Sequence, residues 1–228
     1  MTSLLLASFT QAFIDLDTML SLSINGHHNA FWDVFMPLFS SKMVWVLFYL
    51  SLVFLIARNF FWRVTLLWLV AVAILILVCD QLSSSVLRPM VCRLRPCDPE
   101  NPISGMVHLV NDYRPVSYSC PSAHAANTWG LATLIACIFR RKWLTAAMFS
   151  WAALTCYSRL YLGAHYLGDV LFGMVIGCAG AVLIYRLVKR FFGVENPEQV
   201  RHQHLPAMAL LLTVLAFLVI SGIQAFSK

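Results

Sequence analysis

The chain has 228 residues, of which 60% are hydrophobic and only 11% are charged. Soluble domains carry about 25% charged residues, so this composition excludes an ordinary soluble protein and indicates a polytopic membrane protein. The formal net charge of +6 comes mainly from basic residues near the ends of apolar segments. The sequence has no basic helix with interleaved aromatic residues, so we expect no nucleic-acid partner.

The first segment, residues 4–24, mixes Gln11, Asp15 and Asp17 with leucines. We expect it to form an interfacial amphipathic helix that ends at Asn25-Gly26. Its first thirteen residues lack a positively charged start, so we expect no cleavable signal peptide.

Six apolar runs follow that are long enough, or nearly so, to cross a membrane. The first run is short, and we expect it either to extend backward through residues 34–41, with Pro37 near its start, or to tilt little in a thin section of the membrane. The sequence therefore predicts an all-α polytopic bundle, a single domain over residues 1–228, with six transmembrane helices and an N-terminal interfacial helix. The runs are residues 43–57, 60–84, 122–139, 143–160, 166–188 and 205–224.

The distribution of basic residues predicts the orientation of this bundle. The connections after the first, third and fifth runs hold nine of the sixteen lysines and arginines. The positive-inside rule places these connections in the cytoplasm, and both chain termini on the outer face. Of the other seven, Arg88, Arg95 and Arg159 belong to the site predicted below. The remaining four have no assigned role: Lys42, Arg93, Arg114 and Lys228.

The cysteines do not indicate a secreted, disulfide-bonded protein, because most of them lie within apolar runs. Cys92, Cys97 and Cys120 fall in the long polar connection that follows the second run. A bridge between two of these three would leave the third unpaired, and the sequence does not decide the pairing.

Three polar clusters are predicted at the outer ends of the helices. The first, Arg88-Pro-Met-Val-Cys-Arg-Leu-Arg95-Pro96, leaves the second run, and the second, Pro121-Ser122-Ala123-His124, opens the third. The third cluster runs from Ser158-Arg159 through His165 to Asp169. Ionisable groups at membrane depth are costly, so their concentration here indicates a functional site.

The residue types in these clusters suit phosphoryl transfer. His165 and Asp169 are four residues apart, so on a helix they share one face and the carboxylate can hold the imidazole in one tautomer. Arg159 offers a planar fork of donors for a phosphate. Ser122 is a candidate helix cap, and the backbone N–H groups that follow it near Ala123 can bind an anion.

Together the clusters resemble the three motifs of the type 2 phosphatidic acid phosphatase (PAP2) superfamily, in its bacterial membrane lipid phosphatase branch. These motifs are Lys-x6-Arg-Pro, Pro-Ser-Gly-His and Ser-Arg-x5-His-x3-Asp. The third matches without a gap from Ser158 to Asp169, whereas Ala123 replaces the glycine of the second and Arg88 replaces the lysine of the first. An arginine keeps the positive charge but changes a point charge into a planar fork.

The resemblance implies that His165 attacks phosphorus and forms a phosphohistidine, that Asp169 orients it, and that His124 is the general acid. It implies a metal-independent phosphatase without a cofactor, in the bacterial inner membrane, with its site facing the periplasm or exterior. The substrate is a lipid phosphate from the bilayer. Undecaprenyl pyrophosphate and lipid A are favoured, and phosphatidylglycerophosphate and phosphatidate are also candidates. The implied phosphate-binding residues are Arg88, Arg95, Ser122, Ala123 and Arg159.

Other interpretations of the same residues remain open. The chain fits a non-enzymatic transporter or a lipid-binding protein, and a vanadate-dependent haloperoxidase would use a similar pocket. Taken alone, Arg159 could be an arginine at a helix end that snorkels to the interface, and a His-x3-Asp pair could belong to a metal site. We expect the histidines at 27 and 28 to lie in a turn at the membrane interface. His108 is interpreted either as an ordinary polar loop residue or as part of the wall of a head-group pocket. The oligomeric state is not predicted.

Overall fold

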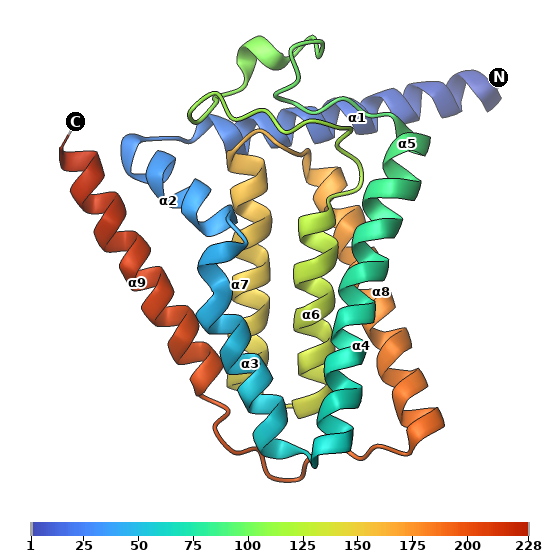
Figure 1. Ribbon diagram of the computed structural model, residues 1–228. Helices are drawn as coiled ribbons and strands as arrows, with labels where there is room; N and C mark the ends of the chain where they lie inside the picture. The colour runs from blue at the N-terminus through green and yellow to red at the C-terminus, as the bar shows by residue number, and fades with distance from the viewer. Residues whose placement is uncertain (1, 228) are drawn as a thin grey trace.

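The protein is described by a computed structural model that covers residues 2–227, with side-chain surroundings from residue 9 onward. This part of the chain has nine α-helices and no β-strand (Figure 1). The prediction of an all-α protein is confirmed. The helices are α1 (Thr2–Gly26), α2 (Ala30–Ser40), α3 (Val46–Asn59), α4 (Trp62–Gln81), α5 (Arg88–Val91), α6 (Ala123–Phe139), α7 (Lys142–Tyr161), α8 (Leu167–Phe192) and α9 (Leu205–Phe226).

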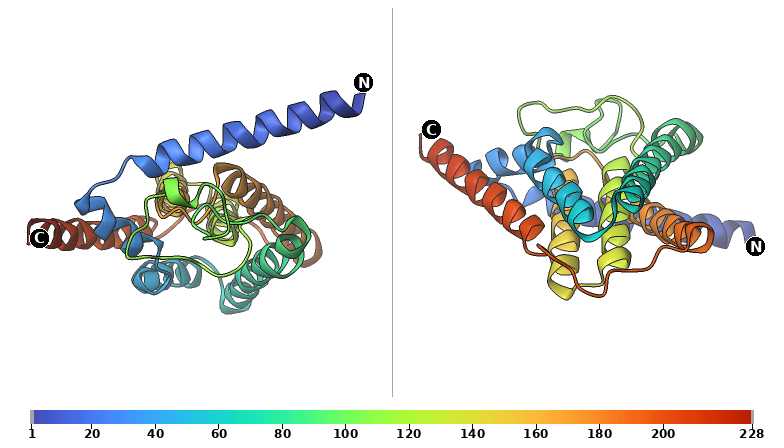
Figure 2. Two further views of the ribbon diagram at one scale, coloured as in Figure 1. Left: turned by 90° about the horizontal axis from the view of Figure 1, so that it is seen from above. Right: turned by 60° about the horizontal axis from the view of Figure 1, so that its bottom comes forward.

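Helix α1 lies across one end of the bundle, roughly at right angles to the central helices (Figures 1 and 2). Asp17, Ser21 and Asn25 are buried against the bundle, while Phe13 and Met19 are exposed. This pattern is amphipathic in an unusual sense, because the buried face is the polar one. The predicted N-terminal helix and its end at Asn25-Gly26 are therefore confirmed, and its place at a membrane interface stays a prediction.

Helices occupy all six predicted runs, but six transmembrane helices are not confirmed. Within residues 2–227, three helical segments are long and apolar enough to cross a membrane, namely Trp62–Val91, Leu167–Phe192 and Leu205–Phe226. A fourth is obtained if the bent pair formed by α2 and the helix after it is one span. Helix α6 has only 17 residues and lies between α4, α7 and α8, so much of its apolar surface meets protein.

The predicted backward extension of the first run is wrong as a continuous helix. The segment Ala30–Ser40 is bent by 70° from Met43–Asn59. Ser41 adopts an extended conformation that ends α2, and the short 3-10 helix η1 (Met43–Trp45) follows. The indole Nε1 of Trp45 donates to the carbonyl of Phe39 across the bend at 2.9 Å, which holds the two helices in this angle.

Close packing of α6 against α8 brings two of the polar clusters together. Gly173 and Gly177 face α6 so closely that a Cβ at either position would collide with a backbone carbonyl oxygen, of Ser122 or Ala126 respectively. Only glycine permits this approach. The start of α6 and the start of α8 are therefore fixed beside each other.

The three basic connections, between α3 and α4, α6 and α7, and α8 and α9, all lie at one end of the bundle (Figure 1). Both ends of the described chain and the long loop of residues 92–121 lie at the other end, where the loop covers α6 and α7 (Figure 2). The basic connections and the ends of the described chain are thus at opposite ends of the bundle, and the assignment of the basic end to the cytoplasm stays a prediction. Lys228, counted in that prediction, lies outside the described residues.

Candidate active site

All three predicted clusters meet at the end of the bundle beneath the long loop. Arg88 follows the π-helical segment η2 (Leu82–Leu87) that continues α4. Ser122 to His124 begin α6, and Arg159 lies in the last turn of α7. His165 lies in the turn between α7 and α8, and Asp169 in the first turn of α8.

His165 is 1% exposed and lies against a buried arginine. Arg95 donates through Nη1 to the Ala164 carbonyl at 2.7 Å, and the same nitrogen is 3.2 Å from His165 Nε2. Because a guanidinium can only donate, Nε2 is the acceptor and carries a lone pair. The geometry thus selects the imidazole tautomer that is protonated on Nδ1.

The predicted His165–Asp169 pair is present but slightly open. His165 Nδ1 is 3.6 Å from Asp169 Oδ2, just beyond hydrogen-bond distance, and Nδ1 has no other hydrogen-bond partner. A small rotation of the imidazole would close this contact. The two side chains therefore face each other as predicted, with the carboxylate on the side opposite the free lone pair. However, His165 lies in the turn before α8 and not on the predicted helix face.

The Asp169 carboxylate is held by groups that the sequence analysis did not identify. Its Oδ2 accepts from the Tyr166 backbone N–H at 2.9 Å, and its Oδ1 accepts from Arg93 Nη1 at 3.0 Å. Arg93 also pairs with Asp17 of α1 at 2.7 Å and lies over the ring of Tyr166. Asp169 itself is fully buried.

Helix α1 also caps the start of α8. Asp17 Oδ1 accepts from the Gly168 N–H at 2.7 Å, and Ser21 Oγ accepts from the Leu167 N–H at 2.9 Å. These N–H groups belong to the first turn of a helix and have no intrahelical partner. The N-terminal helix is therefore part of the scaffold of the site.

Arg88 and Arg95 of the first cluster converge on the loop residue Ser117. Arg95 donates through Nε to the Ser117 carbonyl at 2.8 Å and through Nη2 to its hydroxyl at 3.4 Å. Arg88 donates to the Pro121 carbonyl at 3.1 Å, with the Ser117 hydroxyl at 3.5 Å. Ser117 adopts a positive φ of 90°, and no sequence signal marks it. Arg88 thus reaches the site although a lysine is usual there.

The start of α6 is joined directly to α8. The Ser122 N–H donates to the Asp169 carbonyl at 3.0 Å, and Ser122 Oγ accepts from the Ala125 N–H at 3.5 Å. The predicted cap is therefore confirmed, although its hydrogen bond is long. Ala123 is the first helical residue and is buried.

Arg159 is not a snorkelling arginine, because it is only 4% exposed. Its Nη1 donates to the Ser40 hydroxyl and its Nη2 donates to the Tyr113 hydroxyl at 3.1 Å. The Nε atom is buried and has no hydrogen-bond partner among the described residues. Arg159 therefore ties the end of α2 to the long loop at the site.

Two cavities meet at His124. One, of about 370 Å³, is lined mainly by apolar side chains of α3, α4, α6 and α7, and its residues include Trp45, Leu52 and Leu131. The other, of about 410 Å³, includes Tyr113 and Arg159 in its lining. Both are lined by Ser40, Ser41, Lys42 and His124.

The burial of the cluster changes the acidity of its loop residues. Burial lowers the pKa of His165 to about 3, with a smaller lowering by the Arg95 charge and an opposing effect of Asp169. The imidazole is therefore neutral at physiological pH. Burial also lowers the pKa of Arg95 to about 10, helped by the charges of Arg88 and Arg159, which leaves this guanidinium protonated at neutral pH.

Of the cysteines, Cys120 contacts the cluster through a side-chain hydrogen bond with Asp169. All seven cysteines are free thiols, which answers the question of the pairing of Cys92, Cys97 and Cys120. His108 contacts Asp33 and Asn25 and does not line either cavity at His124.

Fold and site define a helical membrane protein with a buried histidine–arginine cluster at one end of its bundle. The sequence profile of the PAP2 superfamily matches residues 65–192. A lipid A 4'-phosphatase of Bacteroides thetaiotaomicron is 47% identical over 75% of this chain and 76% of its own. One of Porphyromonas gingivalis is 32% identical over 81% of this chain and 79% of its own.

The structure of LpxE from Aquifex aeolicus shares the fold, with a TM-score of 0.56, 24% identity, and coverage of 75% of this chain and 95% of that one. The chain therefore belongs to the PAP2 superfamily, and it is a phosphatase.

Proposed function

We propose that this phosphatase removes the 4'-phosphate of lipid A through a phosphohistidine on His165. The two curated relatives carry the name lipid A 4'-phosphatase, which favours lipid A over undecaprenyl pyrophosphate, phosphatidylglycerophosphate and phosphatidate. The observation that carries the proposal is the junction of the two cavities at His124. There Arg159 and Lys42, which line the second of these cavities, meet an apolar cavity that suits a lipid chain.

The donors for a phosphate come from all three clusters. Arg88 and Arg95 meet at Ser117, and Arg159 has a buried Nε without a partner. An unsatisfied buried donor costs about 1–3 kcal/mol, which a phosphate oxygen would recover. The first-turn N–H groups of Ala123 and His124 have no intrahelical acceptor and would add to the anion site.

In the first chemical step, Nε2 of His165 attacks phosphorus. A P–N bond forms while the P–O bond to the lipid breaks, and His124 donates a proton to the departing lipid oxygen. Arg95, which contacts Nε2 at 3.2 Å, moves to a phosphate oxygen and frees the lone pair. The positive charge on the phosphorylated imidazole is balanced by Asp169 through Nδ1–H, as the 3.6 Å contact closes.

In the second step, water attacks the phosphohistidine, and His124 takes a proton from that water. The P–N bond breaks, its electrons return to Nε2, and inorganic phosphate leaves. Arginines stabilise the charge that spreads over the equatorial oxygens in both steps, so the proposed chemistry uses no metal ion. Arg93 acts by holding Asp169 in place.

The proposed location is the inner membrane of a bacterium, with the site on the periplasmic face. The three basic connections lie at the end of the bundle opposite the site (Figure 1), and the positive-inside rule assigns that end to the cytoplasm. The phosphate would then enter the cluster from the outer leaflet, with the acyl chains toward the apolar cavity lined by Trp45 and Leu131.

The test is phosphate release by the purified protein in detergent with a chelator, using the four lipids named above. The wild type, His165→Ala and a control, His202→Ala, are compared; His202 lies in the exposed connection before α9. We expect lipid A to lose its 4'-phosphate with the wild type and the control only, as mass spectrometry of the product would show. Release from another lipid alone would reject the proposed substrate, and activity in folded His165→Ala would reject the phosphohistidine.

A further inference from the structure

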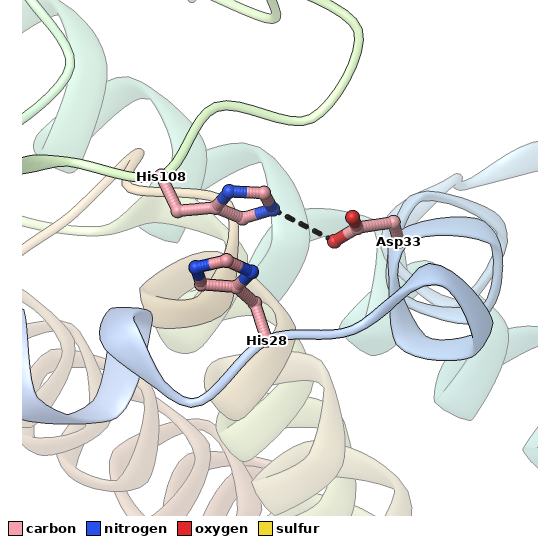
Figure 3. A group of neighbouring side chains, drawn as sticks. All are labelled: His28, Asp33 and His108. Carbon is pink, nitrogen blue, oxygen red and sulfur yellow. Dashed lines mark hydrogen bonds and ion pairs between the residues drawn. The ribbon is translucent and has the colours of Figure 1, made fainter.

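A second cluster of polar side chains lies at the outer end of the bundle and has no role in the reaction proposed above. His28 belongs to the turn between α1 and α2, Asp33 to the first turn of α2, and His108 to the long loop (Figure 3). One ligand atom from each of these three residues lies within 4.8 Å of those of the other two. Three segments far apart in the sequence thus bring two imidazoles and a carboxylate to one point.

Two of the three side chains in this cluster are joined by a hydrogen bond, and the third is stacked on one of them. His108 Nε2 is 2.8 Å from Asp33 Oδ1. The His28 ring stacks on the His108 ring with centroids 3.6 Å apart and planes 1° apart, and among the described residues it makes no hydrogen bond. Figure 3 shows a nitrogen of each ring on the side that faces Asp33. Two of the three side chains are partly buried and His28 is exposed.

Surrounding hydrogen bonds hold two of these residues in place. The Tyr161 hydroxyl donates to Asp33 Oδ1 at 2.6 Å. Asn25 accepts from the His108 N–H at 2.7 Å and donates to the His108 carbonyl at 3.1 Å. Such outer contacts are typical of metal ligands, because they fix the orientation of the coordinating groups.

We propose that His28, Asp33 and His108 bind a divalent transition-metal ion, with zinc as the best fit. Two imidazoles and one carboxylate are a donor set that zinc accepts, whereas calcium and magnesium prefer oxygen donors. Zinc bonds of about 2.0–2.2 Å require His28 to approach the other two ligands, and the ion takes the place of the proton between His108 and Asp33. The exposed His28 ring turns out of its stack to direct a nitrogen at the ion, and His108 binds through Nε2 with its proton on Nδ1.

The bound ion would join the long loop to α2. That loop supplies Ser117 and Tyr113, and α2 ends at Ser40, which accepts from Arg159. The ion is therefore structural: it stabilises the cover of the proposed active site and takes no part in the chemistry. This role is independent of which lipid is the substrate.

The experiment uses full-length protein without a polyhistidine tag, treated with a chelator and then dialysed. Zinc binding is measured by calorimetry and metal analysis for the wild type, His28→Ala and His108→Ala. The control is His27→Ala, a neighbouring exposed histidine. We expect one zinc ion per chain in the wild type and the control, with affinity reduced about 10- to 100-fold or more in the other two.

Zinc should also raise the unfolding temperature of the wild type and the control but not of His28→Ala. This exposed substitution is the decisive one, since His108→Ala removes a contact of the loop and could disturb folding. The proposal is overturned if folded wild type binds no zinc, or if His28→Ala binds zinc as tightly as the control does. Failure of the phosphatase assay would leave both results unchanged, so the two proposals are tested separately.

Discussion

The contribution of α1 to the active site can be tested by the substitution Asp17→Ala. Asp17 is 7% exposed, pairs with Arg93 at 2.7 Å, and accepts from the Gly168 N–H at 2.7 Å. Removing one partner of a buried ion pair costs about 3–5 kcal/mol. Arg93 is 24% exposed, so water can partly solvate it. We therefore expect loss of this ion pair to lower the free energy of unfolding by about 2–3 kcal/mol. Loss of the helix cap adds about 1 kcal/mol.

We therefore expect Asp17→Ala to lower the free energy of unfolding by about 3–4 kcal/mol. Its effect on catalysis follows from Arg93, which also donates to Asp169. With Arg93 loosened, the carboxylate orients His165 less well. Misplacement of a catalytic group can lower the rate up to about 100-fold, so we expect kcat to fall about 10- to 100-fold with KM little changed.

The matched control is Asp15→Ala, because Asp15 is exposed on the same helix and pairs only with Gln11 among the described contacts. Both variants are compared by thermal unfolding in detergent and by lipid A phosphate release at a temperature where each is folded. If Asp17→Ala unfolds and turns over as Asp15→Ala does, then α1 does not support the site, and the reasoning is refuted.

Four further outcomes are expected. Gly177→Leu should lower stability by at least about 3 kcal/mol in thermal unfolding, because its side chain meets the α6 backbone; near-wild-type stability would contradict the packing. His165 is protonated near pH 6.5 in the unfolded chain and near pH 3 in the folded chain. The free energy of unfolding should therefore fall as the pH drops between these values, by up to about 1.4 kcal/mol per pH unit. Above about pH 6.5 the contribution of His165 should be constant. The measurement is the unfolding temperature as a function of pH. The same pH dependence in His165→Gln and in the wild type would disprove this prediction. Arg88→Lys should keep phosphate release within about tenfold of wild type, whereas Arg88→Ala should lose about 100-fold or more; equal losses would mean that charge alone is not the requirement. Lys42 lines both cavities at His124, where its charge can attract the lipid phosphate. Lys42→Ala should therefore raise KM about two- to fivefold with kcat unchanged, as for an exposed ion pair; an unchanged KM would show that Lys42 does not bind the lipid.

Much of the fold followed from features that are local in the sequence. Apolar runs and the Asn25-Gly26 stop located the helices, because helix formation depends on residues within a few turns. The three clusters could be assigned to one end of the bundle because consecutive spans alternate in direction. The contact between His165 and Asp169 was predicted from their spacing of four residues, but His165 lies in the turn before α8 and not on a face of that helix.

The sequence could not reveal contacts between distant segments. The bend between α2 and α3 depends on a Trp45 hydrogen bond to the Phe39 carbonyl, which no periodicity encodes. Arg93 had no assigned role, and only the folded chain places it between Asp17 and Asp169, residues that lie 76 positions before and after it.

The sequence by itself determined the helical class, the family and the residues that carry the proposed chemistry, because motifs and apolar runs are properties of short stretches. The tertiary structure decided how those residues are held, namely by α1, whose polar face turns inward, and by Ser117, which both Arg88 and Arg95 contact. It also brought His28, Asp33 and His108 together. These arrangements arise from packing, and packing joins side chains whose separation along the chain carries no signal.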